Sequence, residues 1–159
     1  MTIEAPLSKF KKTNLKIYIA SCIVLAAFFA YDGYLSKYQW SCRRGFYEKH
    51  VKEGRLDDTM VWNQRLPFIL GAVAIAFAVW LRTIKDKKLL ADENELIISD
   101  EKRISYDSIK KIDKTNFSSK GFFIVTYENQ SGNEISCKLS DKTYDNLSAV
   151  LDKLIAKIS

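Results

Sequence analysis

The chain has 159 residues, is 47% hydrophobic and carries a formal net charge of +6 at pH 7. The excess positive charge lies in residues 1–88, which hold fifteen basic and seven acidic side chains, whereas residues 89–159 hold ten basic and twelve acidic ones. A basic stripe on the soluble part would be needed to neutralise nucleic-acid phosphates, so this distribution argues against a nucleic-acid-binding protein.

The sequence lacks the residue groupings typical of a disulfide framework, a metal site or an active site. Cys22, Cys42 and Cys137 lie far apart, and the single histidine, His50, has no cysteine or second histidine three or four residues away. Glycine-rich phosphate loops and serine elbows are absent from the sequence as well. We therefore expect a non-catalytic protein without a metal, a cofactor or a small-molecule substrate.

The first apolar segment is uncharged from Ile17 to Tyr31 and predicts a transmembrane helix over residues 15–36. Such a helix needs about 20 residues to cross a bilayer. Asp32 lies near its end, among the aromatic residues Tyr31, Tyr34, Tyr38 and Trp40. Aromatic side chains of this kind gather at the membrane–water interface, so we expect water to reach the Asp32 carboxylate.

The second apolar segment, from Leu66 to Leu81, is also uncharged and predicts a transmembrane helix over residues 63–84. Pro67 fits the first turn of this helix, where its missing N–H removes no hydrogen bond. A loop of residues 37–62 separates the two spans, and a basic segment of residues 1–14 precedes them. The alternative is a buried helical hairpin in a soluble protein, but the flanking Lys and Arg residues favour membrane insertion.

Basic residues close to the spans predict the orientation. They are dense before the first span and after the second, and spread more thinly over the loop between them. Because basic flanks stay in the cytoplasm, we expect a two-span protein of a bacterial inner membrane with both termini cytoplasmic. The side chains expected to contact anionic lipid headgroups are Lys11, Lys12, Lys16, Arg82, Lys85, Lys87 and Lys88.

Small residues recur every four positions on both spans. The positions expected to pack helix against helix are Cys22, Ala26, Ala30, Ala74 and Ala78. Small side chains allow helix backbones to approach closely in a membrane. These rows fit a packed hairpin, and they would also fit a homo-oligomer.

A charged connector, residues 85–94, leads to a soluble domain over residues 95–159. Short apolar and alternating segments predict about five antiparallel strands, including Gly121–Glu128 and Glu134–Ser140. In the last strand Cys137 shares a face with two apolar residues, so we expect it in the core. A closing helix, capped by Ser140 or Asp141, carries the apolar stripe Leu147, Val150, Leu151, Leu154 and Ile158.

The strand Gly121–Glu128 is apolar on both faces. One interpretation is that residues 109–117 supply a second core layer that covers its other side. Our hypothesis is that part of this surface, near Phe117 and Phe122, contacts another protein or the membrane edge.

The tail, about residues 92–158, resembles the bacterial pleckstrin-homology-like domains that follow one or two membrane spans. The resemblance lies in the order of the segments ELIIS, RISYDSIKKID, GFFIVTY and NEISCKLS, followed by the closing helix. It implies a partly open antiparallel barrel closed by its C-terminal helix, and binding or scaffolding instead of catalysis. A full member has seven strands, whereas this tail has room for about five. The first hairpin reads SDEKR, unlike the basic hairpin of phosphoinositide-binding members, so no ligand residues are carried over.

The fold expected is thus an α+β membrane protein: a two-helix transmembrane hairpin followed by a small antiparallel sheet or partial barrel and a closing helix. The function expected is that of an adaptor or accessory subunit of a larger membrane assembly, with the tail as a protein-interaction module. Its partners would be membrane lipids and other membrane-protein subunits, or further copies of the chain as a homo-oligomeric scaffold.

The remaining alternative is an enzyme using His50 with Glu48, Glu53, Asp57 or Asp58, although EKHVKEGRLDD is more simply a solvated, helix-like loop.

Overall fold

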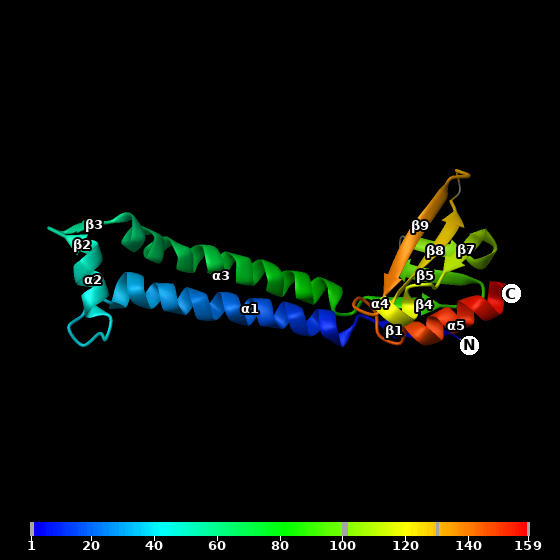
Figure 1. The fold of residues 1–159 in the computed structure, drawn as a ribbon, viewed down its shortest axis with the longest axis horizontal. Helices are drawn as coiled ribbons and strands as arrows, with labels where there is room; N and C mark the ends of the chain where they lie inside the picture. The colour runs from blue at the N-terminus through cyan, green and yellow to red at the C-terminus, as the bar shows by residue number, and fades with distance from the viewer. Residues whose placement is uncertain (1, 100–101, 130, 159) are drawn as a thin grey trace. The chain divides into compact units, whose positions relative to one another are not determined.

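The computed structural model describes residues 2–99, 102–129 and 131–158. Contacts divide the chain into two compact units (Figure 1). The hairpin unit is Asn14–Leu81, and the sheet unit combines Met1–Thr13 with Arg82–Ser159. The residues before the first long helix therefore belong to the same unit as the C-terminal domain.

Two long helices form the hairpin unit. α1 (Lys9–Ala30) continues into a π-helical turn, η1 (Tyr31–Leu35), and α3 covers Asp58–Ile84. Both are long and apolar enough to cross a membrane, and only 6% and 11% of the most apolar stretch of each is buried. An amphipathic helix of a soluble domain hides its apolar stripe in the core. These two helices instead leave most of their apolar side chains exposed.

The helices meet along a seam of buried and half-buried residues spaced three and four apart. On α1 and η1 the seam contains Leu15, Ile19, Cys22, Ala26, Phe29 and Gly33, and on α3 it contains Asn63, Pro67, Leu70, Ala74, Phe77 and Leu81. The ring centroids of Tyr18 and Phe77 lie 5.9 Å apart, and at the other end the Gln64 side-chain amide donates to the Gly33 carbonyl at 3.1 Å. This spacing is the heptad pattern of closely aligned helix pairs.

The segment between the long helices is folded. It forms α2 (Arg44–His50) and then a small hairpin of β2 (Val51–Lys52) and β3 (Arg55–Leu56). Glu53 and Gly54 have φ angles of 52° and 74°, the left-handed pair that a two-residue hairpin turn requires. The expected helix-like loop is therefore helical only in its first part, because Glu53 and Gly54 reverse the chain.

The sheet unit contains two antiparallel sheets. The first has the strand order β1-β4-β5-β6, with β1 at Ile3–Pro6, β4 at Lys88–Ala91, β5 at Glu95–Ser99 and β6 at Lys102–Ser105. The second has the order β7-β8-β9, with β7 at Ile109–Asp113, β8 at Phe122–Glu128 and β9 at Glu134–Ser140. Two short helices, η2 (Tyr106–Ser108) and α4 (Phe117–Lys120), connect the strands, and α5 (Leu147–Ile158) follows them.

The predicted combination of two long apolar helices, antiparallel sheets and a C-terminal helix is confirmed. The expected count of about five strands in the tail is confirmed, because β5 to β9 lie there and Ile109–Asp113 is one of them. The first sheet gains two further strands from outside the predicted domain, β1 and β4. Within the described residues the two sheets do not close into a barrel.

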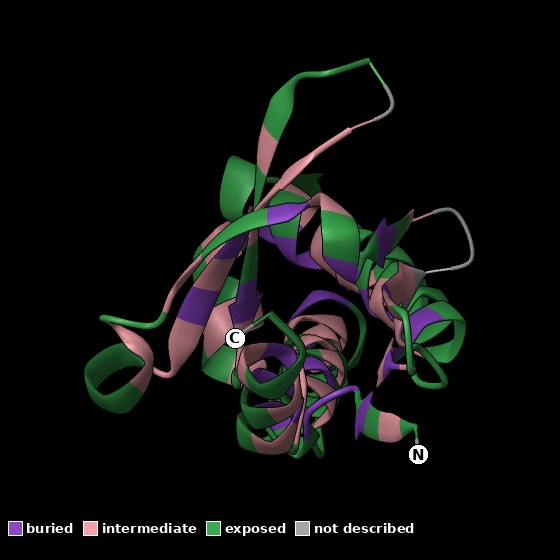
Figure 2. Cartoon of the chain, turned by 90° about the vertical axis from the view of Figure 1, so that its right-hand side faces the viewer, coloured by how far each residue is buried: buried purple, intermediate pink, exposed green. Residues whose placement is uncertain are grey.

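The core of the sheet unit draws on every strand of both sheets and on α5 (Figure 2). Its buried side chains are Ala5, Leu89, Ala91, Leu96, Ile104, Tyr106, Ile109, Phe123, Val125, Leu139, Leu147, Val150, Leu151 and Leu154. Cys137 is half-buried and packs against this core, on the face where the sequence placed it. Burial of the Tyr106 hydroxyl raises its pKa, and that hydroxyl donates to the Asp92 carbonyl at 2.8 Å.

The helix α5 begins at Leu147, so the predicted cap at Ser140 or Asp141 is wrong. The Ser140 carbonyl accepts hydrogen bonds from the N–H groups of Thr143 and Tyr144, at 2.9 and 3.0 Å, and the Asp145 N–H donates to Pro6 at 2.9 Å. These bonds hold residues 141–146 in a turn between β9 and β1. The expected apolar stripe is buried at four positions, while Ile158 is 39% exposed.

Candidate functional site

The N-terminal strand is tied firmly into the sheet unit. β1 pairs with β4 from Ile3 opposite Ala91 to Pro6 opposite Lys88. Beyond the strand, the Leu7 N–H donates to the Lys87 carbonyl at 3.1 Å and the Ser8 N–H donates to the Thr143 carbonyl at 2.8 Å. The residues that enter α1 and those that leave α3 are thus held in one sheet.

Sequence reasoning missed this strand and treated residues 1–14 as a basic extension. Ile3, Ala5 and Leu7 alternate with Thr2, Glu4 and Pro6, which is the period of a strand with one buried face. Ala5 is fully buried and Leu7 is 3% exposed. Pro6 is tolerated because β1 is an edge strand and proline lacks only the outward N–H. The alternation was the available signal, although the partner strand lies beyond both long helices.

At the other end of α1, an ion pair joins the helix to the following loop. The Arg43 guanidinium donates to both carboxylate oxygens of Asp32, at 2.8 and 2.6 Å. It also lies over two aromatic rings, 5.7 Å from the centroid of Phe28 and 5.0 Å from that of Phe46. The Asp32 hydrogen bond raises the pKa of Arg43 further, so the guanidinium stays charged.

The expectation that water reaches Asp32 is wrong. Asp32 is 2% exposed, because Arg43 folds back over the carboxylate and η1 packs against α3. Removing a carboxylate from water is costly unless a charge partner and hydrogen bonds compensate it, and the bidentate guanidinium supplies both. The residue is thus a buried partner of Arg43.

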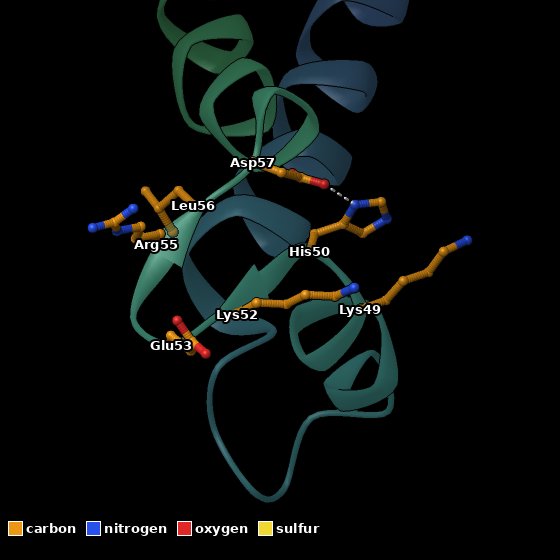
Figure 3. A pocket seen from close by; sticks show the side chains of 7 residues that line it. All are labelled: Lys49, His50, Lys52, Glu53, Arg55, Leu56 and Asp57. Carbon is orange, nitrogen blue, oxygen red and sulfur yellow. Dashed lines mark hydrogen bonds and ion pairs between the residues drawn. The ribbon is translucent and has the colours of Figure 1, made fainter.

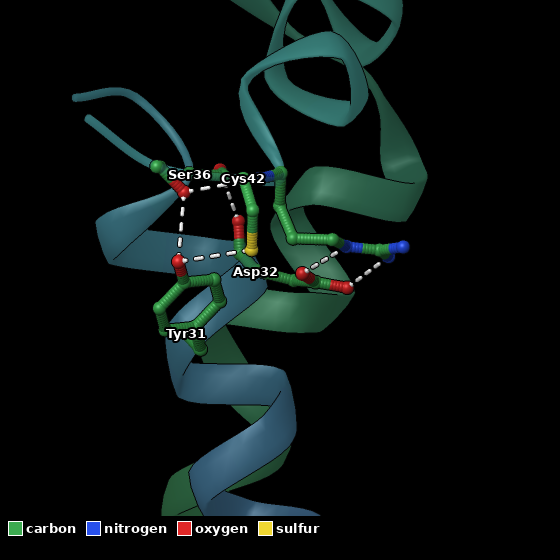
Figure 4. Close-up of polar contacts among 6 residues, drawn as sticks. Tyr31, Asp32, Ser36 and Cys42 are labelled. Atoms are coloured by element: carbon green, nitrogen blue, oxygen red, sulfur yellow. Dashed lines mark hydrogen bonds and ion pairs between the residues drawn. The ribbon is translucent and has the colours of Figure 1, made fainter. Parts of the chain in front are cut away.

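Further polar groups surround this ion pair (Figure 4). The Ser41 hydroxyl donates to the Tyr31 hydroxyl at 3.1 Å, and the Cys42 sulfur lies 3.5 Å from the same oxygen. The Ser36 hydroxyl donates to the Asp32 carbonyl, which lacks its usual helical partner at the end of η1. Each group of this cluster already has a hydrogen-bond partner. The cluster therefore holds the end of the first helix against the loop that follows it.

The second polar group of the hairpin unit contains His50 and Asp57 (Figure 3). His50 Nδ1 lies 2.6 Å from Asp57 Oδ2, and the imidazole ring packs against Phe46 at an interplanar angle of 45°, with centroids 4.4 Å apart. The other Asp57 oxygen accepts the Met60 N–H at 2.9 Å, so Asp57 also caps the start of α3. The hydrogen bonds from Met60 and then from His50 lower the pKa of Asp57.

A shallow depression adjoins this pair, lined by Lys49, His50, Lys52, Glu53, Arg55, Leu56 and Asp57. It contains an imidazole and two carboxylates, but no serine, threonine, cysteine or tyrosine among these residues. Asp57 is committed to capping, and Glu48 is paired with Arg44 at 2.8 Å. The hydrogen bonds of His50 and Asp57 therefore fix the helix start and the neighbouring hairpin.

The residues expected to contact lipid headgroups are at the surface. Lys11 and Lys12 are half-exposed, and Lys16, Arg82, Lys85, Lys87 and Lys88 are exposed. The Lys85 ammonium lies 3.9 Å from the Asp86 carboxylate, and the ammonium of Lys88 pairs with Glu4 at 2.7 Å, across the β1–β4 ladder. Its charge is thus already partly compensated within the sheet unit.

The small residues expected between helices lie mostly on the seam. Cys22, Ala26 and Ala30 are half-buried and Ala74 is 6% exposed. Ala78 is exposed, because Phe77 takes the seam position and packs on Tyr18. The small residues of α1 thus pack against α3 of the same chain, and they give no separate support for self-association.

Phe117 and Phe122 do not share one surface. Phe117 packs edge-on against the core residue Phe123, with centroids 5.7 Å apart. Phe122 is the neighbour of Phe123 in β8, so its side chain points to the opposite face of the strand. There the Lys138 ammonium covers its ring at 3.8 Å from the centroid.

No protein-family model matches this sequence, and no curated protein or solved structure is significantly similar to it.

Proposed function

We propose that this chain is a non-catalytic membrane-anchored adaptor, or an accessory subunit of a larger membrane assembly, whose sheet unit binds other proteins. One observation carries the proposal: the apolar hairpin is inserted between β1 and β4, two neighbouring strands of one sheet. A chain that crosses a bilayer twice returns to its starting side, where β1 and β4 can pair. A two-span topology and the split sheet are therefore mutually consistent.

The exposed surface of the hairpin supports membrane insertion. Its exposed apolar residues include Val24, Phe28, Phe68, Ile75 and Val79. A contiguous apolar surface of this length is unstable in water and needs lipid or protein around it. Trp62 and Trp80, both exposed, lie toward the two ends of α3, where interfacial aromatic residues are common. The basic residues near the sheet unit favour a cytoplasmic location for that unit, in a bacterial inner membrane.

We further propose that the sheet unit is a pleckstrin-homology-like domain whose first strand precedes the hairpin. Sheets of four and three antiparallel strands followed by a closing helix support it, since the seven strands match the full count of that fold once β1 and β4 are added to the five strands of the tail. Such domains bind other molecules and do not perform chemistry. The role of binding module follows from this likeness.

A homo-oligomeric scaffold is the second candidate, and it is favoured by β9, which pairs on one side only, with β8, within the described residues. An enzyme using His50 is the third. His50 and Asp57 lie within hydrogen-bond distance, as a general acid–base pair requires. An enzymatic role would require turnover that is lost in His50→Gln while the unfolding temperature stays unchanged.

Cysteine labelling tests the topology. Cys42 is exposed in the segment between α1 and α3, whereas Cys22 and Cys137 are half-buried. In a Cys22→Ala, Cys137→Ser background, a membrane-impermeant maleimide should label Cys42 from outside spheroplasts. In the further variant Cys42→Ser with Thr2→Cys, labelling should occur only in inverted vesicles. Labelling of both positions from one side would exclude a membrane-spanning hairpin.

The native mass of the complex tests the adaptor role. The chain should be extracted in mild detergent from its own membrane, and every co-purifying chain identified by mass spectrometry. We expect foreign subunits at fixed stoichiometry, retained when Ala78→Leu alters only the exposed side of α3. A mass equal to a multiple of 18.3 kDa, with no foreign chain, would replace the adaptor by a scaffold.

A further inference from the structure

The strand β9 is an edge strand. In the order β7-β8-β9 it pairs on one side only, with β8, within the described part of the chain. It lies at the border of its sheet in Figure 1. Glu134, Ser136 and Lys138 are exposed, and Ile135 and Cys137 are half-buried. An edge of this kind presents unpaired backbone N–H and C=O groups to another chain.

The pairing of β9 with β8 determines which of its backbone groups point outward. Asn129 N–H donates to the Asn133 carbonyl at 2.9 Å, and Asp141 N–H donates to the Gly121 carbonyl at 2.8 Å, so both odd-numbered positions face β8. In an antiparallel ladder successive residues alternate between facing the partner strand and facing away from it. Glu134, Ser136, Lys138 and Ser140 therefore direct their backbone groups away from β8.

The free part of this edge is short and centred on one residue. The Ser140 carbonyl is already occupied by the N–H groups of Thr143 and Tyr144, at 2.9 and 3.0 Å. At the other end, Asn133 belongs to the turn that joins β8 to β9. The available backbone groups are those of Glu134, Ser136 and Lys138, with Ser136 in the middle.

The charges along this segment are arranged so that it complements itself. When two copies of Glu134–Lys138 run antiparallel about a two-fold axis at Ser136, Glu134 of each copy lies opposite Lys138 of the other. Glu134, Ser136 and Lys138 then each lie opposite a residue of the second copy whose backbone groups also point outward. A hydrogen-bonded antiparallel ladder requires this arrangement. A shift by two residues would place Lys138 opposite Ser136 and lose both opposite-charge pairs. Charge therefore selects one register.

We propose that β9 pairs with β9 of a second copy, antiparallel and centred on Ser136, to form a continuous sheet across a symmetric dimer. The same patch is used on both copies, as a two-fold interface requires. On one face two Glu134–Lys138 pairs flank the Ser136 pair, and on the other each Ile135 meets Cys137 of the second copy. Cross-strand pairs of these types each stabilise a sheet. This inference concerns self-association alone and does not depend on foreign partners or on membrane topology.

Charge reversal provides the central test, on the purified full chain in mild detergent. Wild-type protein should sediment as a dimer, after correction for bound detergent. Glu134→Lys places lysines opposite each other in both pairs, and Lys138→Glu does the same with glutamates. Each change should raise the dimer dissociation constant by roughly tenfold or more. Mixing the two variants restores both Glu–Lys pairs, so the equimolar mixture should dimerise as the wild type does. Lys114→Glu is the matched control, an exposed charge reversal away from β9.

A second variant tests the backbone ladder independently of charge. Ser136→Pro removes an N–H that points away from β8 and adds a ring at the centre of the free edge. It should abolish dimerisation while the circular dichroism spectrum and unfolding temperature stay close to those of the wild type. A monomeric wild type at all accessible concentrations would overturn the proposal. So would a dimer that survives both single reversals, since another surface would then hold it.

Discussion

Gly33 and Asn63 are in direct backbone contact where η1 crosses α3. A Cβ atom built on Gly33 would lie 2.7 Å from the Asn63 carbonyl oxygen and 2.8 Å from its carbonyl carbon. Backbone atoms cannot move aside as a flexible side chain can. Gly71, elsewhere on α3, has no atom within 4 Å of such a Cβ, so the requirement for glycine is local.

Gly33→Ala should therefore destabilise the hairpin by about 1–3 kcal/mol, the usual cost of forcing extra atoms into a packed contact. Gly71→Ala should leave stability unchanged or raise it by about 0.5–1 kcal/mol, because alanine favours the helix. Thermal unfolding of the full chain in detergent compares the two. Equal effects would mean that the close approach at Asn63 is absent.

The ion pair at the end of α1 predicts an asymmetry. Arg43→Met leaves the Asp32 carboxylate buried without a partner, whereas Asp32→Asn leaves a guanidinium whose side chain is 42% exposed and can be solvated. Arg43→Met should lower the unfolding temperature more than Asp32→Asn, and the double variant should recover part of the loss. The reverse order would show that Asp32 reaches water.

Gly121 should be the least replaceable glycine of the sheet unit. It has φ of +68°, and a Cβ there would lie 1.9 Å from Asp141 Oδ2, whereas Gly132 has φ of +79° and only Glu128 nearby, at 3.8 Å. Both alanine variants carry the cost of a left-handed backbone, about 1 kcal/mol, and Gly121→Ala adds the clash. In a denaturant titration, Gly121→Ala should have a lower free energy of unfolding than Gly132→Ala. If Gly132→Ala were equally or less stable, the clash with Asp141 would not contribute to the cost at Gly121.

The N-terminal strand should control the stability of the C-terminal domain. Ala5 is fully buried against the core, so Ala5→Asp introduces an unpaired charge there and should cost about 3 kcal/mol or more. Glu4→Gln, at the exposed neighbouring position, should cost much less. Proteolysis of residues 88–158 reports the difference. A domain that resists protease equally in both variants would mean that β1 is dispensable.

The start of α3 should weaken in acid. Hydrogen bonds from Met60 and His50 hold the pKa of Asp57 below its ordinary value. A carboxylate with a depressed pKa stabilises the fold fully above its unfolded pKa of about 3.9, and this contribution is lost as the pH falls through the lower folded value. The protection of the Met60 amide against hydrogen exchange, corrected for intrinsic rates, should fall below about pH 4.

Asp57→Asn is the control for this effect, because asparagine caps a helix without titrating. Its protection should be independent of pH over the same range. A wild type that shows no acid loss would mean that the cap does not depend on the charged carboxylate.

Local patterns in the sequence predicted much of the fold. The uncharged runs around Ile17 and Leu66 were long enough to predict α1 and α3, and the alternation after Glu134 predicted β9 and its buried face. These features are set by residues within one element. The Glu53-Gly54 turn was equally local, but its two left-handed residues were read as part of a helix-like loop.

The remaining features depend on contacts between separate segments of the chain. β1 gains its partner only at Lys88–Ala91, and Asp32 is neutralised by an arginine on a separate loop. α5 begins later than the sequence predicted, because hydrogen bonds to the Pro6 and Ser140 carbonyls hold the preceding residues in a turn. Propensity and periodicity describe one segment at a time, so such pairings cannot be read from either segment alone.

The split of the first sheet also constrains how the protein is made. β1 leaves the ribosome before α1 and α3, whereas β4, its partner, is synthesised after both. Chains grow at about 5–20 residues per second, so β1 must wait several seconds without a partner strand. Because Ala5 belongs to the core, folding of the sheet unit is completed only after synthesis has passed both helices. Completion of this sheet thus marks nascent chains whose hairpin has turned back correctly, and chains that fail would expose β1 and β4 to quality-control proteases.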